Sequence, residues 1–102
     1  MEERLKIKIS DVYKVLKAID LLKGLQLFDE DVIDHEINVS DQMFVDSIAK
    51  FNNHTNDLVN ASEKEDMKLI RDSLINLRVE SMNIASDFDN LKDDIGELIK
   101  AL

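Results

Sequence analysis

Cysteine and proline are absent from this chain of 102 residues, and glycine occurs only twice, at positions 24 and 96. Without cysteine the chain forms no disulfide, no thiolate metal site and no cysteine nucleophile. Without proline and with so little glycine, few positions can interrupt a helix. Hydrophobic residues make up 44% and charged residues 34%, a balance typical of a folded helical protein rather than of a disordered chain.

Long apolar runs are also missing. The N-terminus lacks the apolar stretch of a cleavable signal peptide, and no window approaches the 18 apolar residues of a membrane helix. Positive charge is scarce, because the net charge is −9, which opposes binding to nucleic acid or to anionic membranes. We therefore expect no nucleic-acid partner, no membrane insertion, and a cytoplasmic protein or one secreted without a cleaved signal peptide. The acidity keeps a small protein soluble or, in the alternative interpretation, meets a basic partner.

No group of residues has the spacing of a catalytic, cofactor or metal site. The two histidines, His35 and His54, lie on different segments, and the neighbouring acids Asp34 and Glu36 rarely converge with His35 on one ion. The acids in 29–34 lack the glycine and the terminal glutamate of a calcium loop. We predict that the protein is not an enzyme and needs no cofactor or metal.

The most regular pattern of the chain lies between Ser62 and Leu102. Its spacing alternates between three and four and averages 3.5, which keeps one face of a helix toward a partner along its whole length. This periodicity predicts a single long helix over 63–101. Its members are Met67, Ile70, Leu74, Leu77, Ser81, Ile84, Phe88, Leu91, Ile95, Leu98 and Leu102.

Two serine–aspartate pairs, Ser10-Asp11 and Ser40-Asp41, precede this helix and resemble helix starts. A serine caps free N–H groups, and an acid complements the helix dipole. The dense acids after position 28 are unfavourable at the C-terminal end of a helix, so they predict an exposed connection. The expected elements are an extended segment 1–10, a helix 11–28, an acidic connection 29–40 and a helix 41–60.

A capping box, Ser62 with Glu65, and a break in apolar phase between Leu58 and Met67 predict a tight turn before the long helix. The fold class is therefore all-α. We expect a single domain, an elongated antiparallel helical hairpin or three-helix bundle with one long C-terminal helix. In the hairpin the two earlier helices cover the long one, whereas in the bundle the half from Phe88 to Leu102 projects and exposes its apolar stripe.

The flanks of the apolar pattern carry charges of opposite sign, which favours some helix pairings over others. The ordinary interpretation is that they flank a core built with the chain's own helices. In a parallel homodimer, by contrast, Asp87 would reach Lys92 of the second copy. The polar Ser81 either fixes register or marks a thin spot over a large neighbour such as Phe51. The predicted partner-binding residues are Phe88, Leu91, Ile95, Leu98, Leu102, Asp87 and Lys92, between a basic flank (Arg71, Arg78, Lys92) and an acidic flank (Glu80, Asp87, Asp94).

The opening Lys6-Ile7-Lys8-Ile9-Ser10-Asp11-Val12 resembles the start of small helical partner proteins encoded beside LXG toxins of Gram-positive type VII secretion. The stretches 79–82 and 87–96 have a cadence similar to that of their C-terminal helix. Tryptophan is absent, so the W-x-G motif of the related helical-hairpin family is missing, and Phe88 is followed at the fourth position by Lys92 instead of the acid of an export signal. The resemblance implies a protein that binds the helical N-terminal region of an effector.

These observations predict a non-enzymatic adaptor or chaperone that pairs with a helical partner, either an effector or a second small helical protein. The alternative is an acidic inhibitor, such as an immunity protein, antitoxin or phage antagonist, that blocks a basic site on its target through the acids in 29–36.

Overall fold

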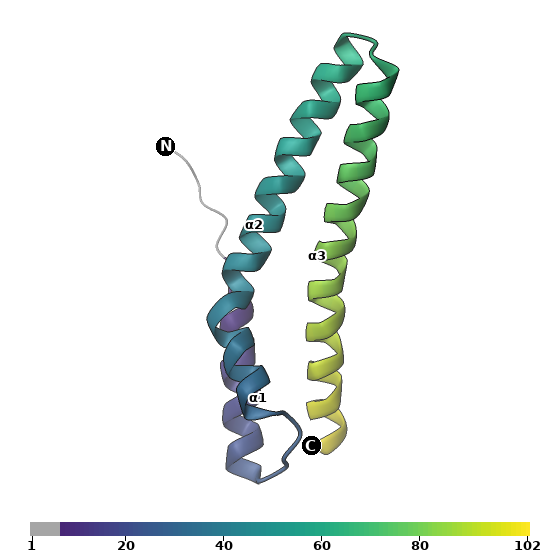
Figure 1. Ribbon diagram of the computed structural model, residues 1–102. Coiled ribbons are helices and arrows are strands. Elements are labelled where there is room, and N and C mark those ends of the chain that lie inside the picture. Colours follow the sequence, from purple (N-terminus) through teal and green to yellow (C-terminus); the bar gives the residue numbers. More distant parts are fainter. Residues whose placement is uncertain (1–6) are drawn as a thin grey trace. The chain divides into compact units, whose positions relative to one another are not determined.

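The computed structural model describes residues 7–102, and these form three helices with no strand among them (Figure 1). They are α1 (Ile9–Lys23), α2 (Glu30–Glu63) and α3 (Met67–Ala101). The predicted all-α class is confirmed, whereas most of the predicted extended segment 1–10 lies outside the described residues. The chain divides into two compact units: unit 1 is Met1–Val45 with Asp87–Leu102, and unit 2 is Asp46–Ser86.

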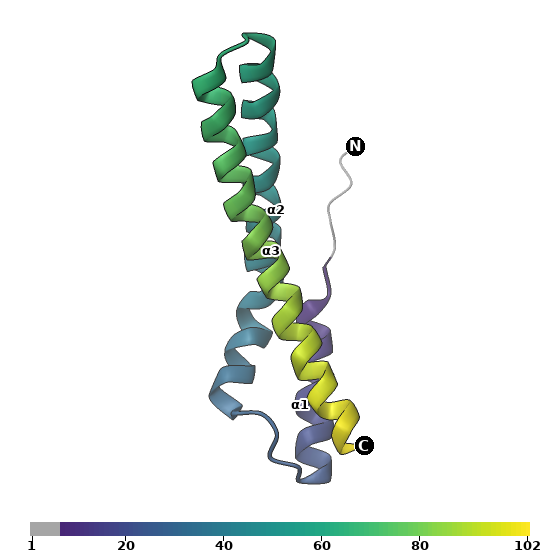
Figure 2. The same ribbon diagram turned by 90° about the vertical axis from the view of Figure 1, so that its right-hand side faces the viewer.

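Unit 1 packs α1 with the first part of α2 and the last part of α3 as a three-helix bundle. Within this unit α1 and α3 run in the same direction and α2 runs in the opposite one (Figures 1 and 2). The rings of Phe44 and Phe88 meet edge to face, with centroids 5.1 Å apart and planes at 81°, a favoured aromatic geometry. Residues buried in this unit include Ile9, Tyr13, Leu16, Ile33, Phe44, Leu91 and Leu98.

Unit 2 is an antiparallel helical hairpin built from the last part of α2 and the first part of α3 (Figure 2). Its buried apolar residue is small: Ala61 of α2 is 3% exposed. Ser73 of α3 is 6% exposed. Small side chains let two helix backbones approach closely, so this hairpin packs through close approach at Ala61 and Ser73 as well as through its half-buried apolar residues.

Helix α1 ends at Lys23 rather than at the predicted residue 28, because Gly24 adopts a left-handed conformation with φ of 62°. The N–H of Leu25 donates to the carbonyl of Asp20 at 3.1 Å, completing a Schellman motif. The buried carboxylate of Asp20 then accepts from the backbone N–H of Leu27 at 3.0 Å and of Phe28 at 3.2 Å. One acidic side chain thus satisfies the backbone of the connection that follows α1.

The predicted acidic connection 29–40 is wrong, because α2 already begins at Glu30. Asp29 caps this helix by accepting from the N–H of Val32 at 3.0 Å, and acids in a first turn complement the positive end of the helix dipole. The predicted helix start at Asp41 is wrong for the same reason. Asp41 lies inside α2 and accepts hydrogen bonds from both the backbone N–H and the hydroxyl of Ser10.

The predicted turn before the long helix exists but lies further along the chain, at residues 64–66. Helix α2 continues through Ser62 to Glu63, so the predicted capping box at 62–65 is wrong. The cap of α3 is Asp66, whose carboxylate accepts from the N–H of Leu69 at 3.1 Å. Glu65, in the turn between α2 and Asp66, has a φ of 55°, a conformation that costs a non-glycine residue free energy.

Candidate functional site: an apolar groove and an acidic pocket in unit 1

The heptads of α3 split into two rows that differ in exposure. The second row, Ile70, Leu77, Ile84, Leu91 and Leu98, is buried or half-buried. The first row is mostly exposed: Leu74 is 51% exposed, Phe88 46% and Leu102 73%. The face of α3 that packs inside the protein is therefore rotated away from the first row. Ser81, also in this row, is exposed and donates to the carbonyl of Leu77 at 2.8 Å, so it covers no large neighbour.

The exposed row contributes to an apolar groove in unit 1, between α1 and α3. The groove has two adjoining parts of about 420 Å³ each, and Phe88 and Leu91 line both of them. One part is completed by Lys92, Ile95, Gly96 and Ile99 of α3. The other part is completed by Ile7, Lys8, Ile9 and Val12. We call these residues together the apolar groove.

The residues predicted to bind a partner fall into different environments. Leu91 and Leu98 are only 8% and 6% exposed, so the chain itself covers them. Phe88 is half-exposed in the groove, and Leu102 is exposed at the end of α3. Ile95 is half-buried and also lines the groove. Their role toward a partner stays a prediction, and the structure shows which of them a partner could reach.

The two charged residues of that prediction lie apart. Lys92 is on the rim of the groove with its side chain 72% exposed, and its ammonium group is 3.6 Å from Asp89 and 3.8 Å from Asp93. Asp87 instead lines a separate pocket among the three helices. The predicted contact between Asp87 and Lys92 of a parallel second copy would therefore need a carboxylate that lies on the inner side of α3.

The acidic flank of α3 faces inward, which the apolar periodicity alone does not indicate. Glu80 is 8% exposed, and burial raises the pKa of Asp87 above its ordinary value. Burial also raises the pKa of Asp94, opposed by the hydrogen bond that it accepts from Tyr13. Burial and then the negative charge of Asp94 raise the pKa of Tyr13 well above its ordinary value. These carboxylates are thus held in a poorly solvated interior.

Asp87 belongs to what we call the acidic pocket, a space of about 150 Å³ in unit 1. Glu36 and Ser40 of α2 and Asn90 of α3 line it, with Tyr13, Ile9 and Met43 completing the walls. Ser40 is 9% exposed, and its hydroxyl has no hydrogen-bond partner among the described residues. A buried polar atom normally finds a partner, so this pocket has unused hydrogen-bonding capacity.

A signal for this pocket was present in the sequence at heptad spacing. Helix α2 carries Ser40, Ser47, His54 and Ala61 seven residues apart, and α3 carries Ser73, Glu80, Asp87 and Asp94 at the same interval. Both are rows of small or polar side chains, so a search for apolar periodicity passes over them. Within unit 1 the first of these rows meets the second at Ser40 and Asp87.

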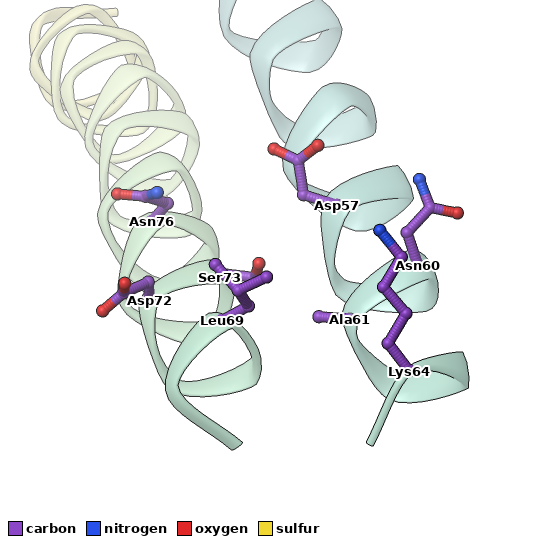
Figure 3. Close-up of a pocket in the computed structure, with 8 residues that line it drawn as sticks. All are labelled: Asp57, Asn60, Ala61, Lys64, Leu69, Asp72, Ser73 and Asn76. Carbon is purple, nitrogen blue, oxygen red and sulfur yellow. The ribbon is translucent and has the colours of Figure 1, made fainter. Parts of the chain in front are cut away.

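Unit 2 has a hollow of its own, of about 370 Å³, beside the turn that joins α2 and α3 (Figure 3). Ala61 points from α2 toward α3, and Leu69 and Ser73 point back from α3 (Figure 3). The charged Asp57, Lys64 and Asp72 stand around its edge. Because the hollow lies over the small residues of the close helix contact, the packing of the hairpin accounts for it.

Two polar contacts fix the helices of unit 1 against each other. Lys17 of α1 forms an ion pair with Asp34 of α2, and this hydrogen bond raises the pKa of Lys17. Asp41 is partly desolvated, which opposes ionisation, but the hydrogen bonds from Ser10 lower its pKa below the ordinary value. Both contacts join α1 to α2, so they hold Tyr13 of α1 beside the pocket residues of α2.

Comparison with protein-family models, with curated proteins and with solved structures finds no match for this chain. Among residues 7–102, no helix combines the length and apolar character needed to span a bilayer. Within the same described part of the chain, no three potential metal-ligating side chains come together.

Proposed function

We propose that this protein is a helical interaction module, an adaptor or chaperone, whose apolar groove binds an amphipathic helix of another protein. The observation that carries the proposal is the groove itself, an apolar surface formed by α1 and α3 and bordered by Lys8 and Lys92. Its α3 side runs from Phe88 to Ile99, about 17 Å at 1.5 Å per residue. A helix of three to four turns matches this length, and helix-in-groove docking reads such anchors at three- and four-residue spacing.

Gly96 supports a closely packed occupant. Glycine within a helix costs about 0.5–1 kcal/mol relative to alanine, yet Gly96 lies inside α3 and lines the groove. Apart from its chain neighbours and the adjacent backbone of α3, no atom of the described chain lies within 4 Å of where its Cβ would stand. Packing within the described chain therefore gives no reason for glycine here, whereas a helix docking against the groove does, since small residues allow close approach.

A second protein suits the groove better than a second copy of this chain. Homodimers of parallel helices depend on complementary charges across the interface. The rim of the groove presents Lys8 and Lys92, whereas the acidic flank of α3 faces the interior. Two copies joined through this groove would bring lysines together, and Lys92 of each copy already lies beside Asp89 and Asp93 of its own chain. The resemblance to partner proteins of LXG effectors names one such protein, the helical N-terminal region of an effector.

The test is binding to the helical N-terminal region of an LXG effector, measured by co-purification and calorimetry. Ile99→Asp introduces a charge at a groove residue that is 67% exposed, so the fold tolerates it and binding should fall at least about tenfold, because a charge is desolvated without a partner. Val32→Asp is the matched control, since Val32 is 62% exposed and does not line the groove. Wild-type affinity in Ile99→Asp, or no complex at all, contradicts the proposal.

Gly96→Ala separates binding from stability. Beyond its chain neighbours and the adjacent backbone of α3, the added methyl group meets no atom of the described chain, so the free energy of unfolding should rise by about 0.5–1 kcal/mol. The same methyl group lies in the groove and should weaken the complex. A variant that is both more stable and equally well bound would show that nothing packs against Gly96.

The alternative function, an acidic inhibitor of a basic site, rests on the charge of unit 1. This unit contains fifteen Asp and Glu and eight Lys and Arg, whereas unit 2 contains seven and five. Asp29 caps α2 and Asp34 pairs with Lys17, so a clean test neutralises Glu30 and Asp31, which are exposed. Loss of inhibition of a nuclease or toxin target in Glu30→Gln/Asp31→Asn, with retained stability, would favour this alternative.

A further inference from the structure

We propose that the acidic pocket of unit 1 binds the cationic end of an arginine or lysine side chain that the partner protein inserts between α2 and α3. The source of this side chain rests on the proposed function, whereas the chemistry of the pocket stands on its own residues. The pocket is a second contact point, because it shares only Ile9 with the apolar groove.

The polar atoms of the pocket suit a cation that carries several N–H groups. Glu36 and Asp87 supply carboxylates, which repel anions and accept hydrogen bonds from ammonium or guanidinium groups. None of the ion pairs of residues 7–102 engages either carboxylate. The hydroxyl of Ser40 is a further acceptor, buried and without a partner in the described chain.

The apolar walls suit the stem of such a side chain. Ile9 is buried and Met43 is 54% exposed, so one forms the floor and the other stands at the surface. Lysine and arginine bury their methylene groups along apolar surface while the charged end finds polar partners. The volume of about 150 Å³ corresponds to about five water molecules at roughly 30 Å³ each, which is enough for the end of one side chain and too little for a helix.

The burial of Asp87 agrees with an unfilled cation site. Burial is the cause that raises its pKa, and no positive charge of the described chain opposes that effect. A cation in the pocket would favour the ionised carboxylate and so oppose this rise in pKa. Tyr13, Glu36 and Asp94 are the other titratable groups that face this part of the interior.

The test uses small probes and the full-length protein, so it needs no partner. Nitrogen-15 spectra are recorded during titration with propylguanidinium chloride and with butylammonium chloride, and tetramethylammonium chloride serves as the control cation without N–H donors. We expect saturable shifts at the backbone amides of Ser40 and Asn90 with the first two probes and none with the control. Asp87→Asn should weaken probe binding at least about tenfold, because a hydrogen bond to a charged group is lost. Asp89→Asn removes an exposed charge from the same helix and should leave binding unchanged.

Several results would overturn the proposal. If the two N–H probes give no localised shifts, the pocket holds water only. If tetramethylammonium binds equally well, or if Asp87→Asn binds like Asp89→Asn, the contacts described above are not those of the site. A more than tenfold tightening in Arg4→Gln/Lys6→Gln would show that the chain's own basic residues compete for the pocket, which overturns the assignment to a partner.

The probes also distinguish this proposal from the proposed function. Ile99→Asp alters the groove and not the acidic pocket, so it should leave probe binding unchanged while it weakens binding of the helical partner at least about tenfold. Probe binding without any helical complex would retain the pocket and reject the adaptor function. A helical complex of unchanged affinity in Asp87→Asn would retain the adaptor function and reject the partner's basic side chain.

Discussion

Replacing Asp20 with alanine should lower the free energy of unfolding by about 3 kcal/mol. The carboxylate accepts hydrogen bonds from the N–H groups of Leu27 and Phe28, and a bond to a charged group contributes about 1.5–3 kcal/mol. Leu27 and Phe28 are half-buried, so water reaches part of the backbone after the substitution and the lower figure applies to each bond. Asp20→Asn keeps one acceptor oxygen and should lose about half as much.

Urea unfolding followed by circular dichroism measures this effect, because the whole domain is stable by only about 5–15 kcal/mol. Asp11→Asn is the matched control on the same helix: its side chain is 61% exposed and lies 3.7 Å from Lys14, and such exposed pairs contribute about 0–1 kcal/mol. A loss below about 1 kcal/mol in Asp20→Ala, or a loss no greater than that of Asp11→Asn, would refute the assignment of Asp20 as the anchor of the connection after α1.

Two further predictions concern charge burial and helix capping. Burial raises the pKa of Asp87, so the folded state binds its proton more tightly than the unfolded chain does, and the contribution of this group to stability should rise as pH falls from 7 toward the ordinary pKa near 4. The Asp87→Asn variant should therefore melt at a higher temperature at pH 7 than Asp89→Asn, and its melting temperature should depend less on pH. A lower stability than that of Asp89→Asn would contradict this prediction. Asp66→Ala should lower the free energy of unfolding by about 1 kcal/mol through loss of the cap of α3, and Ser62→Ala should lower it by less than half as much. Equilibrium unfolding measures both, and the opposite order would show that Ser62 caps the helix instead.

Composition and periodicity were sufficient to predict the fold class and the long helix. The absence of proline and the 3.5-residue period predicted a helix over 63–101, and α3 spans Met67–Ala101. The period cannot tell which of two neighbouring rows packs inside, because both rows share it. That choice depends on the surface that α1 and α2 offer, where Tyr13 donates a hydrogen bond to Asp94 of the acidic flank.

The sequence predicts the wrong position for the acidic segment after residue 28, because its composition fits both a connection that follows one helix and the first turn of the next. Acids are unfavourable at the end of one helix and favourable at the start of the next. Gly24 is the one residue before Asp29 whose type indicates where the first helix ends. Its left-handed conformation ends α1 at Lys23, which moves the acids to the first turns of α2. The pocket residue Ser40 has a similar ambiguity, since a serine followed by an aspartate resembles a helix cap, whereas this serine lies inside α2.

The division of the α3 heptads into a covered row and an open row places different constraints on alternate positions of one helix. Changes at Leu91 or Leu98 alter packing within the chain and are felt as lost stability, whatever the protein binds. Changes at exposed positions such as Leu74 or Leu102 leave the fold almost untouched. Substitutions along α3 are therefore constrained in two different ways: by the stability of the fold at the covered row, and by any contact with another molecule at the open row.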